Sequence, residues 1–389
     1  MPTLDSSDWL ALLCGSAAPE AFTARKITAL TINPGCRRRA VLDAAGVNKT
    51  RLLVRLGYPV RDGRSPFAIV RGRAFEEQVK RDGYAALITL LRAALAVPIA
   101  EAAVADLNGA GETADLPSRA TRTRHLLRRL VAGKDERLIL DRPVLPFTVA
   151  GRTVHLEPDA LTHRINGRFY LIEIKSFSAI DGRADAEKVA EVTKQAATYV
   201  LALRALVRAL GGDPADIADE YLLVCPKDFS NLPFCSLVDL RQQLEHVAFQ
   251  LARLEGADRL AAALFDALGP AATLDLSTDA LGKPFRADHE LRATLDVLAP
   301  LFGPDCLAHC ELAPHCRAEA TVAGEPARFG STVRDAVPGI ASTGAALRLI
   351  SGAEEPDETQ RDVVEMLRRA EQLREQALGR ARSAEGGAA

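Results

Sequence analysis

The segment LEPDALTHRINGRFYLIEIKSF (Leu156–Phe177) predicts two adjoining β-strands joined by a tight turn. Asn166-Gly167 is typical of a two-residue hairpin turn, because both positions need positive φ and these residues tolerate it best. The turn brings Asp159 back towards the strand that carries Glu173 and Lys175. Alternate side chains of a strand point to the same face, so we expect these last two to share one charged face.

Two carboxylates and an ammonium in this arrangement suit hydrolysis of a phosphodiester. Carboxylate oxygens hold Mg²⁺ or Mn²⁺, which neutralises phosphate charge and lowers the pKa of a water molecule. An ammonium positions that water or stabilises developing charge. Arginine is the usual cation of this chain, with only nine lysines among 49 basic residues, so the lysine at position 175 is a specific choice. The alternative is an edge strand whose charged face only meets solvent.

A long helix is predicted downstream of this hairpin, over AEKVAEVTKQAATYVLALRALVRAL (residues 186–210). Its apolar residues recur at helical spacing, and Gln195 and Tyr199 lie four residues apart, hence on one face. With these residues the sequence resembles the RecB-like branch of the PD-(D/E)xK nucleases. Pro158-Asp159, Glu173-Ile174-Lys175 and Gln195-x-x-x-Tyr199 match the motifs of that branch in chain order.

The resemblance implies an α/β fold with a restriction-endonuclease-like core, in which a mixed sheet is flanked by helices. It also implies metal-dependent cleavage of DNA, with Asp159 and Glu173 as ligands of Mg²⁺ or Mn²⁺. Lys175, Gln195 and Tyr199 are the other catalytic residues that it implies. Each of these roles is an expectation from the resemblance, carried over to the matching positions.

A third candidate metal ligand lies upstream. RGRAFEEQVKRDGYAALITLLRAALA (residues 71–96) predicts one long helix. Its Gly72-x-x-x-Glu76 lies where the families resembled have a glycine followed four residues later by a histidine or an acidic residue. Glu76 would then replace that histidine as a ligand of the metal or of water. The alternative is an exposed glutamate in the first turns of a helix.

Four cysteines extend the resemblance. They are Cys36, which stands alone in NPGCRRRA, and Cys306, Cys310 and Cys316, which form C-x3-C-x5-C. This pattern is similar to iron–sulfur members of the branch, the AddB nuclease domain and the CRISPR-associated RecB-like exonucleases, where one early and three late cysteines bind a [4Fe–4S] cluster. Those families usually have C-x2-C, which leaves the cluster type open. Zinc would accept the same thiolates, with His309 and His315 as substitutes, and four ordinary buried cysteines are the third possibility.

Arginines indicate where DNA would lie. Cations greatly outnumber acids between Arg37 and Arg73, and a later segment, TRTRHLLRRLVAGKD (121–135), predicts a basic helix. Such local excess suits a phosphate backbone, and the alternative is a solvated arginine-rich surface. The predicted nucleic-acid contacts are Arg37, Arg38, Arg39, Arg71, Arg73 and Arg128. Just upstream, Ile27 to Ile32 is predicted to be extended, with a helix starting near Cys36.

The other strands complete an α/β pattern. RLILDRPVLPFTVA (137–150) and RTVHLEPDALTH (152–163) predict a meander with the strand over 169–175, and residues 220–224 predict one further strand. Two regions follow: residues 1–330 as a RecB-like nuclease domain with an iron–sulfur clip, and residues 331–389 as a helical C-terminal extension with a disordered tail at SAEGGAA.

Composition sets the class of protein. The chain has 389 residues, 48% hydrophobic and 26% charged, with a formal net charge of −2, so affinity for nucleic acid must come from local patches. We expect no signal peptide, and no apolar run reaches the length of a membrane span. Seven cysteines without disulfide-framework spacing fit a reducing cytoplasm.

Two functional hypotheses follow. The first is a metal-dependent DNA nuclease, an exonuclease on single-stranded or end-bearing DNA, in DNA repair or antiviral defence. The second is a non-cleaving nucleic-acid-binding or assembly subunit, which would have no chemical need for Asp159, Glu173 and Lys175 together. The sequence lacks GxxxxGK[ST], so a helicase that unwinds DNA would come from a partner.

Overall fold

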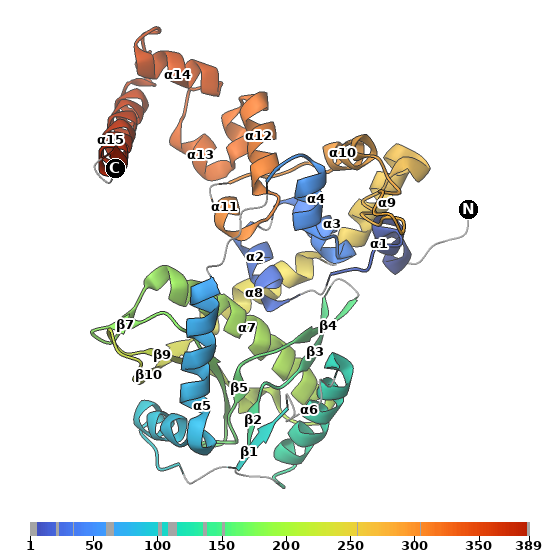
Figure 1. Cartoon of the computed structure of the whole chain (residues 1–389), viewed down its shortest axis with the longest axis vertical. Coiled ribbons are helices and arrows are strands. Elements are labelled where there is room, and N and C mark those ends of the chain that lie inside the picture. Colours follow the sequence, from blue (N-terminus) through green and yellow to red (C-terminus); the bar gives the residue numbers. More distant parts are fainter. Residues whose placement is uncertain are drawn as a thin grey trace.

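The computed structural model describes residues 6–20, 23–33, 35–59, 66–99, 103–107, 115–134, 138–149, 152–254, 256–303 and 305–386. Figure 1 shows a lower lobe built on a β-sheet, an upper lobe made of helices, and further helices that lead away to the C-terminus. Helices from the N-terminal part of the chain and from residues 257–323 share the core of the upper lobe. Among the described residues, no helix has the length and apolar character needed to cross a membrane.

Six strands form one mixed sheet in the order β1-β2-β5-β6-β9-β10. They are β1 (Ala103–Asp106), β2 (Leu138–Asp141), β5 (Ala160–Leu161), β6 (Phe169–Ile174), β9 (Ile217–Pro226) and β10 (Pro233–Asp239). The pairs β1/β2 and β6/β9 are parallel, whereas β5 pairs antiparallel with both β2 and β6, and β10 antiparallel with β9. The predicted α/β fold with a mixed sheet flanked by helices is confirmed.

Helices cover both faces of the sheet because its strands are apolar on both sides. On β6, Leu171 packs towards α7 (Ala186–Ala209), and Ile172 packs towards α5 (Pro66–Leu95). The α7 side also contains α2 (Ala24–Ile32), α6 (Leu116–Val131) and α8 (Arg241–Leu254). Side chains at odd positions of β6 therefore face α7, and that places Glu173 on the same side.

Two short hairpins lie outside the main sheet. They are β3 (Leu145–Val149) with β4 (Arg152–Leu156), and β7 (Ala179–Ile180) with β8 (Arg183–Ala184). The predicted meander is wrong for residues 145–156, because the apolar side chains of β3 and β4 pack into the core under α7 instead of extending the sheet. The meander holds for β2, β5 and β6, which are neighbours in the sheet.

Two predictions for the N-terminal third need correction. Residues 27–32 are helical, not extended: they belong to α2, where Thr23 caps the helix by accepting from the backbone N of Lys26 (3.3 Å). The helix predicted over 71–96 is broken within α5, where Asp82, Gly83 and Tyr84 all have positive φ. Apolar spacing on either side of a break looks the same as spacing along one helix.

The upper lobe is tied together by a buried guanidinium. Its helices are α1 (Ser6–Cys14), α3 (Arg37–Ala45), α4 (Lys49–Arg55), α9 (Ala257–Leu268), α10 (Asp288–Val297), α11 (Cys306–His309) and α12 (Ala313–Ala323). Arg38 of α3 is 1% exposed, and it donates from Nε to Leu298 O (3.0 Å) and from Nη2 to Leu295 O (2.8 Å). It also pairs with Glu319 of α12. One side chain thus links N-terminal α3 to helices 250 or more positions later in the chain.

The C-terminal region is helical. It consists of α13 (Ser331–Ala336), α14 (Thr343–Ser351) and α15 (Arg361–Gly386), and short 3₁₀ turns occur at Pro214–Asp216, Gly269–Ala271 and Pro326–Phe329. Ile340, Leu349 and Val364 form a small core between these helices. Because α15 continues to Gly386, residues 383–386 of the predicted disordered tail are helical, and the last three residues lie outside the described ones.

Replacing Arg38 should destabilise the whole upper lobe. Arg38→Met removes a buried cation and leaves two carbonyls and Glu319 without their partner, so we expect the free energy of unfolding to fall by about 3–5 kcal/mol. Arg37→Met is the matched control, because Arg37 is the exposed neighbour, and such surface changes stay within about 0.5 kcal/mol. Urea denaturation measures both, and equal losses would contradict the tie.

Candidate active site

The hairpin forms as predicted from Asn166-Gly167. These residues have φ of 50° and 82°, the positive values that such a turn requires. β5 and β6 then pair with Ala160 opposite Ile172 and Leu161 opposite Leu171. This register places Asp159, which directly precedes β5, beside Glu173, the next residue along β6.

Asp159, Glu173 and Lys175 meet at the end of β6. The Lys175 Nζ donates to Glu173 Oε2 (2.6 Å) and to Asp159 Oδ2 (3.3 Å). Asp159 Oδ2 also accepts from the backbone N of Ile174 (2.7 Å), and the backbone N of Lys175 donates to Val224 O (2.8 Å) on β9. The predicted convergence of the three side chains is confirmed, and we call this set the carboxylate–lysine cluster.

Burial decides the electrostatics of the carboxylate–lysine cluster. Glu173 is 1% exposed, and burial raises its pKa to about 7, with a further rise from the charge of Asp159 and an opposing effect of Lys175. Burial lowers the pKa of Lys175, but the two carboxylates outweigh it and raise that pKa above its usual value. The ammonium therefore stays charged, while the Glu173 carboxyl exchanges its proton near neutrality.

α7 brings the predicted tyrosine to the carboxylate–lysine cluster. Tyr199 is half-buried, and burial together with the charge of Glu173 raises its pKa well above the usual range, so its phenol stays neutral. Gln195 is half-buried one turn earlier on the same helix. Both residues lie on the helix that covers the Glu173 side of the sheet, and their four-residue spacing puts them on one face of it.

The residues present fit a divalent cation. Glu173 Oε1 is fully buried and has no hydrogen-bond partner among the described residues, whereas Oε2 is taken by Lys175. An unpaired buried carboxylate oxygen costs free energy unless a cation or a proton satisfies it. Asp159, with its side chain 25% exposed, contacts the same Lys175 ammonium as Glu173 does. Within the described residues, however, no three Cys, His, Asp or Glu side chains stand close enough together to hold a metal ion.

Glu76 lies in an adjacent network instead of in the carboxylate–lysine cluster. Its Oε1 accepts from Lys80 Nζ (2.6 Å) and from Arg142 Nη2 (2.8 Å). Lys80 also donates to Asp141 Oδ1 (2.6 Å), the last residue of β2. Burial raises the pKa of Glu76, but the hydrogen bonds of Lys80 and Arg142 outweigh it and hold that pKa below its usual value. Glu76 is therefore an ionised, paired carboxylate.

Sequence reasoning missed Lys80, Asp141 and Arg142. Asp141 is the last residue of the apolar strand β2, and Arg142 directly follows it. Polar residues at the end of a buried strand were the available signal, because strand ends of one sheet meet at an edge. The pairing of Lys80 with Glu76 is also readable, since the two lie four residues apart on α5.

The four cysteines lie in the upper lobe, close to the N-terminal end of α3. Asn33 Nδ2 donates to Cys306 Sγ (3.2 Å), and Asn33 O accepts from the backbone N of Cys36 (3.3 Å). Burial raises the pKa of Cys316 to about 12, Arg38 opposes this rise, and the charges of Cys310 and Cys36 add to it. These interactions bring segments around Cys36 and Cys306–Cys316 together.

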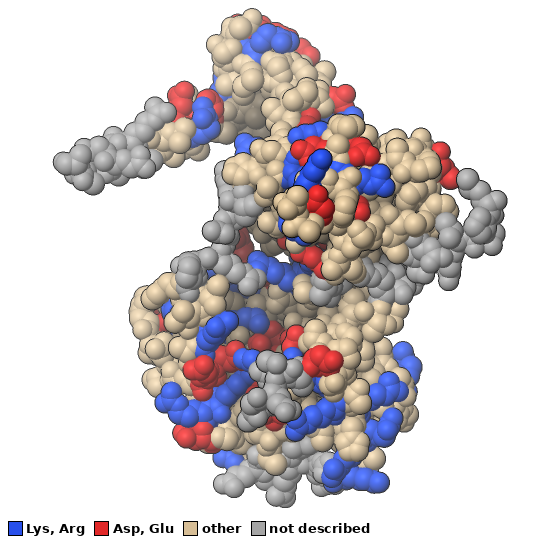
Figure 2. Space-filling model, turned by 45° about the vertical axis from the view of Figure 1, so that its right-hand side comes forward, with Lys and Arg blue, Asp and Glu red and all other residues tan. Residues whose placement is uncertain are grey.

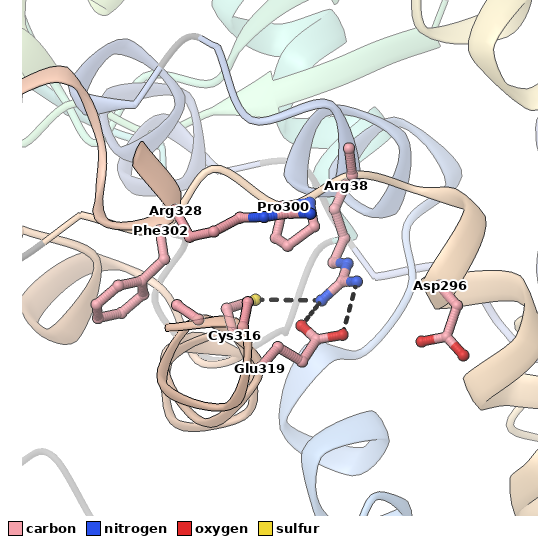
Figure 3. Close-up of a pocket in the computed structure, with 10 residues that line it drawn as sticks. Arg38, Asp296, Pro300, Phe302, Cys316, Glu319 and Arg328 are labelled. Carbon is pink, nitrogen blue, oxygen red and sulfur yellow. Dashed lines mark hydrogen bonds and ion pairs between the residues drawn. The ribbon is translucent and has the colours of Figure 1, made fainter. Parts of the chain in front are cut away.

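Arg38 and Glu319 occupy the wall of a pocket beside Cys316. Figure 3 shows the Arg38 guanidinium pointing at the Cys316 sulfur and the Glu319 carboxylate. The pocket measures about 240 Å³, and Arg328 and Phe302 contribute to its lining. The Arg38 Nη1 donates to Cys316 Sγ at 3.4 Å, so a buried cation is available to a thiolate at this position.

The DNA-contact prediction is wrong for Arg38 and Arg39. Both are buried, and Arg39 donates to Asp43 Oδ2 (3.2 Å) and His309 O (2.8 Å), so neither guanidinium is available to phosphate. A run of arginines cannot reveal which face of a helix they occupy. The remaining predicted contacts are exposed: Arg37, Arg71, Arg73 and Arg128. Figure 2 shows positive and negative side chains intermingled on the visible face, as the near-neutral net charge leads one to expect.

Comparison of the chain with protein-family models and with curated proteins found no match. The function proposed below therefore rests on the residues of the site and on their geometry. The carboxylate–lysine cluster and the unpaired oxygen of Glu173 are its main observations.

The raised pKa of Glu173 predicts a pH-dependent stability in protein freed of metal by EDTA. The folded state holds the Glu173 proton up to about pH 7, whereas the unfolded chain loses it near 4.5. The folded state thus binds more protons between these values, so stability present at low pH is lost as the pH rises. The loss from this group is on the order of 3 kcal/mol.

Glu173→Gln cannot lose a proton, so wild type should lose more unfolding free energy than this variant between about pH 5 and pH 8. Urea denaturation across that range measures the difference. Glu245→Gln, at an exposed position of α8, is the control and should follow wild type. Parallel curves for wild type and Glu173→Gln would mean that Glu173 is ionised throughout.

Proposed function

We propose that this protein is a metal-dependent deoxyribonuclease that hydrolyses phosphodiesters at the carboxylate–lysine cluster. The unpaired Oε1 of Glu173 carries the proposal, because a buried carboxylate oxygen without a hydrogen-bond donor, on a residue that shares Lys175 with a second carboxylate, suits a divalent cation. The cation would be Mg²⁺ or Mn²⁺. When bound, it would supply charge neutralisation at the phosphate and activation of water.

The residues of the site have three further roles: binding the cation, stabilising charge and positioning the DNA. Asp159 and Glu173 hold the cation, and the backbone N of Ile174 fixes the orientation of the Asp159 carboxylate (2.7 Å). Lys175 stays charged and lies against both carboxylates, so it can stabilise negative charge that develops on the phosphate. Tyr199 and Gln195 present neutral polar groups from α7, which suits positioning of the DNA strand.

DNA is the proposed partner, as single strands or free ends acted on by an exonuclease. The exposed arginines 37, 71, 73 and 128 supply local positive charge for a phosphate backbone. A helicase or another subunit would act in trans, and we propose a cytoplasmic setting in DNA repair or antiviral defence. The competing proposal is a non-cleaving nucleic-acid-binding or assembly subunit. The completeness of the carboxylate–lysine cluster favours the enzyme.

We further propose that Cys36, Cys306, Cys310 and Cys316 hold a [4Fe–4S] cluster, with zinc as the alternative. The contact between Asn33 and Cys306, and the proximity of Cys36 and Cys310 to Cys316 that its raised pKa reflects, support a common site. The cation of Arg38 beside Cys316 favours the thiolate form that a metal requires. Such a clip would close a loop over most of the chain, from Cys36 at the N-terminal end of α3 to Cys316 in α12.

Alanine substitutions within the carboxylate–lysine cluster should impair different steps of the reaction. Asp159→Ala removes a ligand and should weaken Mn²⁺ binding. Lys175→Ala leaves both carboxylates in place, so it should retain Mn²⁺ and DNA while cleavage falls by about 100-fold or more. Cleavage is measured with and without Mn²⁺ on end-labelled single-stranded and duplex DNA and on circular DNA. Only an enzyme that attacks internally cuts the circular substrate.

Lys227→Ala is the matched control, since Lys227 is an exposed lysine just beyond β9. It should cleave DNA like wild type. Circular dichroism checks the fold of every variant, because only folded variants report on chemistry. Wild-type cleavage by folded Lys175→Ala would place the activity elsewhere and give the lead to the binding-subunit proposal.

The proposed four-cysteine cluster predicts the colour of the purified protein and its thermal stability. Protein prepared without oxygen should be brown and contain about four irons per chain. Cys36→Ala should lower the melting temperature far more than Cys14→Ala, although both side chains are buried in the same lobe. Stoichiometric zinc without iron would overturn the cluster and retain the clip, whereas equal melting temperatures would remove Cys36 as a ligand.

A further inference from the structure

A second charged network adjoins the carboxylate–lysine cluster, and none of the motifs above includes its central cation. Arg142 donates to Glu76 Oε1 twice, from Nη2 (2.8 Å) and from Nε (3.2 Å). Lys80 donates to the same oxygen (2.6 Å) and to Asp141 (2.6 Å). Two cations therefore share one carboxylate oxygen of Glu76.

Backbone and charge connect this network to Asp159. The backbone N of Arg142 donates to Asp159 O (3.1 Å), and the carboxylates of Glu76, Asp141 and Asp159 all raise the pKa of Arg142 against the effect of burial. The Arg142 side chain thus pairs with Glu76, while its backbone is bonded to Asp159, the residue that directly precedes β5. Arg142 therefore joins the predicted metal ligand on α5 to the one beside β5.

Glu76 lies on the part of α5 that passes the end of β6. A Cβ atom placed on Gly72 would approach the Ser176 hydroxyl to 3.6 Å, and Ser176 directly follows Lys175. Glu76 is one helical turn beyond Gly72 and therefore on the same face of α5. This part of α5 therefore borders the residue after Lys175, while the carboxylate of Glu76 is engaged by Lys80 and Arg142.

Arg142 is the member of the network that solvent reaches. Its side chain is 41% exposed, against 19% for Glu76 and 12% for Lys80. Its backbone has a φ of 48°, a left-handed value that costs a non-glycine residue free energy and that recurs at functional sites. Guanidinium also binds phosphate through two parallel hydrogen bonds, a better match than a single carboxylate oxygen.

We propose that Arg142 is a positioning residue that couples phosphate binding to metal binding. Without DNA it holds Glu76 in an ion pair and keeps it from the cation site. When a DNA phosphate takes the guanidinium, Glu76 is released to join Asp159 and Glu173 as a further ligand. Metal then binds more tightly where substrate is present. The inference rests on the proposed nuclease function and adds a residue that its motifs do not contain.

The test measures Mn²⁺ affinity by calorimetry, with and without a single-stranded phosphorothioate oligonucleotide that resists cleavage. In wild type the oligonucleotide should tighten Mn²⁺ binding by about fivefold or more, the lower end of typical coupling between sites. Arg142→Asn, chosen because asparagine tolerates positive φ, should bind Mn²⁺ more tightly than wild type without DNA and lose most of the coupling. Arg241→Asn, from an exposed ion pair with Asp239, is the control and should match wild type.

A double-mutant cycle with Glu76→Gln separates the release of Glu76 from a simple loss of positive charge. The gain from Arg142→Asn should disappear in the Glu76→Gln background. A gain that persists there, or no gain in either background, would overturn the coupling. Mn²⁺ affinity that is also unaffected by Asp159→Ala would overturn the proposed function itself, whereas loss in Asp159→Ala without any effect of Arg142→Asn would overturn only the inference.

Discussion

The pairing of β5 with β6 is the interaction on which the candidate site depends. Its register places a surface carboxylate, Asp159, next to a fully buried one, Glu173, and a buried carboxylate carries a free-energy penalty of several kcal/mol unless it is paired. Lys175 supplies one partner, and its ammonium lies closer to Glu173 than to Asp159. One Glu173 oxygen remains without a partner among the described residues. The fold therefore maintains a local shortage of positive charge at the end of one strand.

The two faces of the sheet bring different groups to this point. α7 covers the Glu173 face and brings Tyr199, whose neutral phenol adds no charge of its own. α5 covers the opposite face and brings Glu76, already ionised and paired with Lys80 and Arg142. A sheet with one apolar face could not hold both helices. The site thus depends on strands that are apolar on both sides and change to polar residues only at their ends.

Local patterns in the sequence predicted the parts of the site that are close in the chain. The turn at Asn166-Gly167, the shared face of Glu173 and Lys175, and the long helix with Tyr199 all follow from spacing within about 30 residues. Contacts between distant segments were missed, because spacing carries no information about partners. Three consecutive arginines illustrate this: they look alike in sequence, yet Arg38 and Arg39 are buried by partners that lie far along the chain, such as the carbonyls of Leu298 and His309.

Buried cations of the upper lobe also act on the pKa of the nearby cysteines. Arg39 and Lys49 both pair with Asp43, which is a single buried acid, and their charges also lower the pKa of Cys310, which burial raises. Arg38 acts in the same way on Cys316, although Glu319 shares its charge. Interiors rarely keep more cations than anions, because an uncompensated charge costs more than the contacts that it makes. Asp43 shares this compensation with Glu311, which pairs with Lys49 (3.4 Å), and with Glu319, which pairs with Arg38. Two of the arginines that the sequence suggested for DNA, Arg38 and Arg39, are therefore neutralised inside the upper lobe, where their charges oppose the rise that burial causes in the pKa of Cys316 and of Cys310.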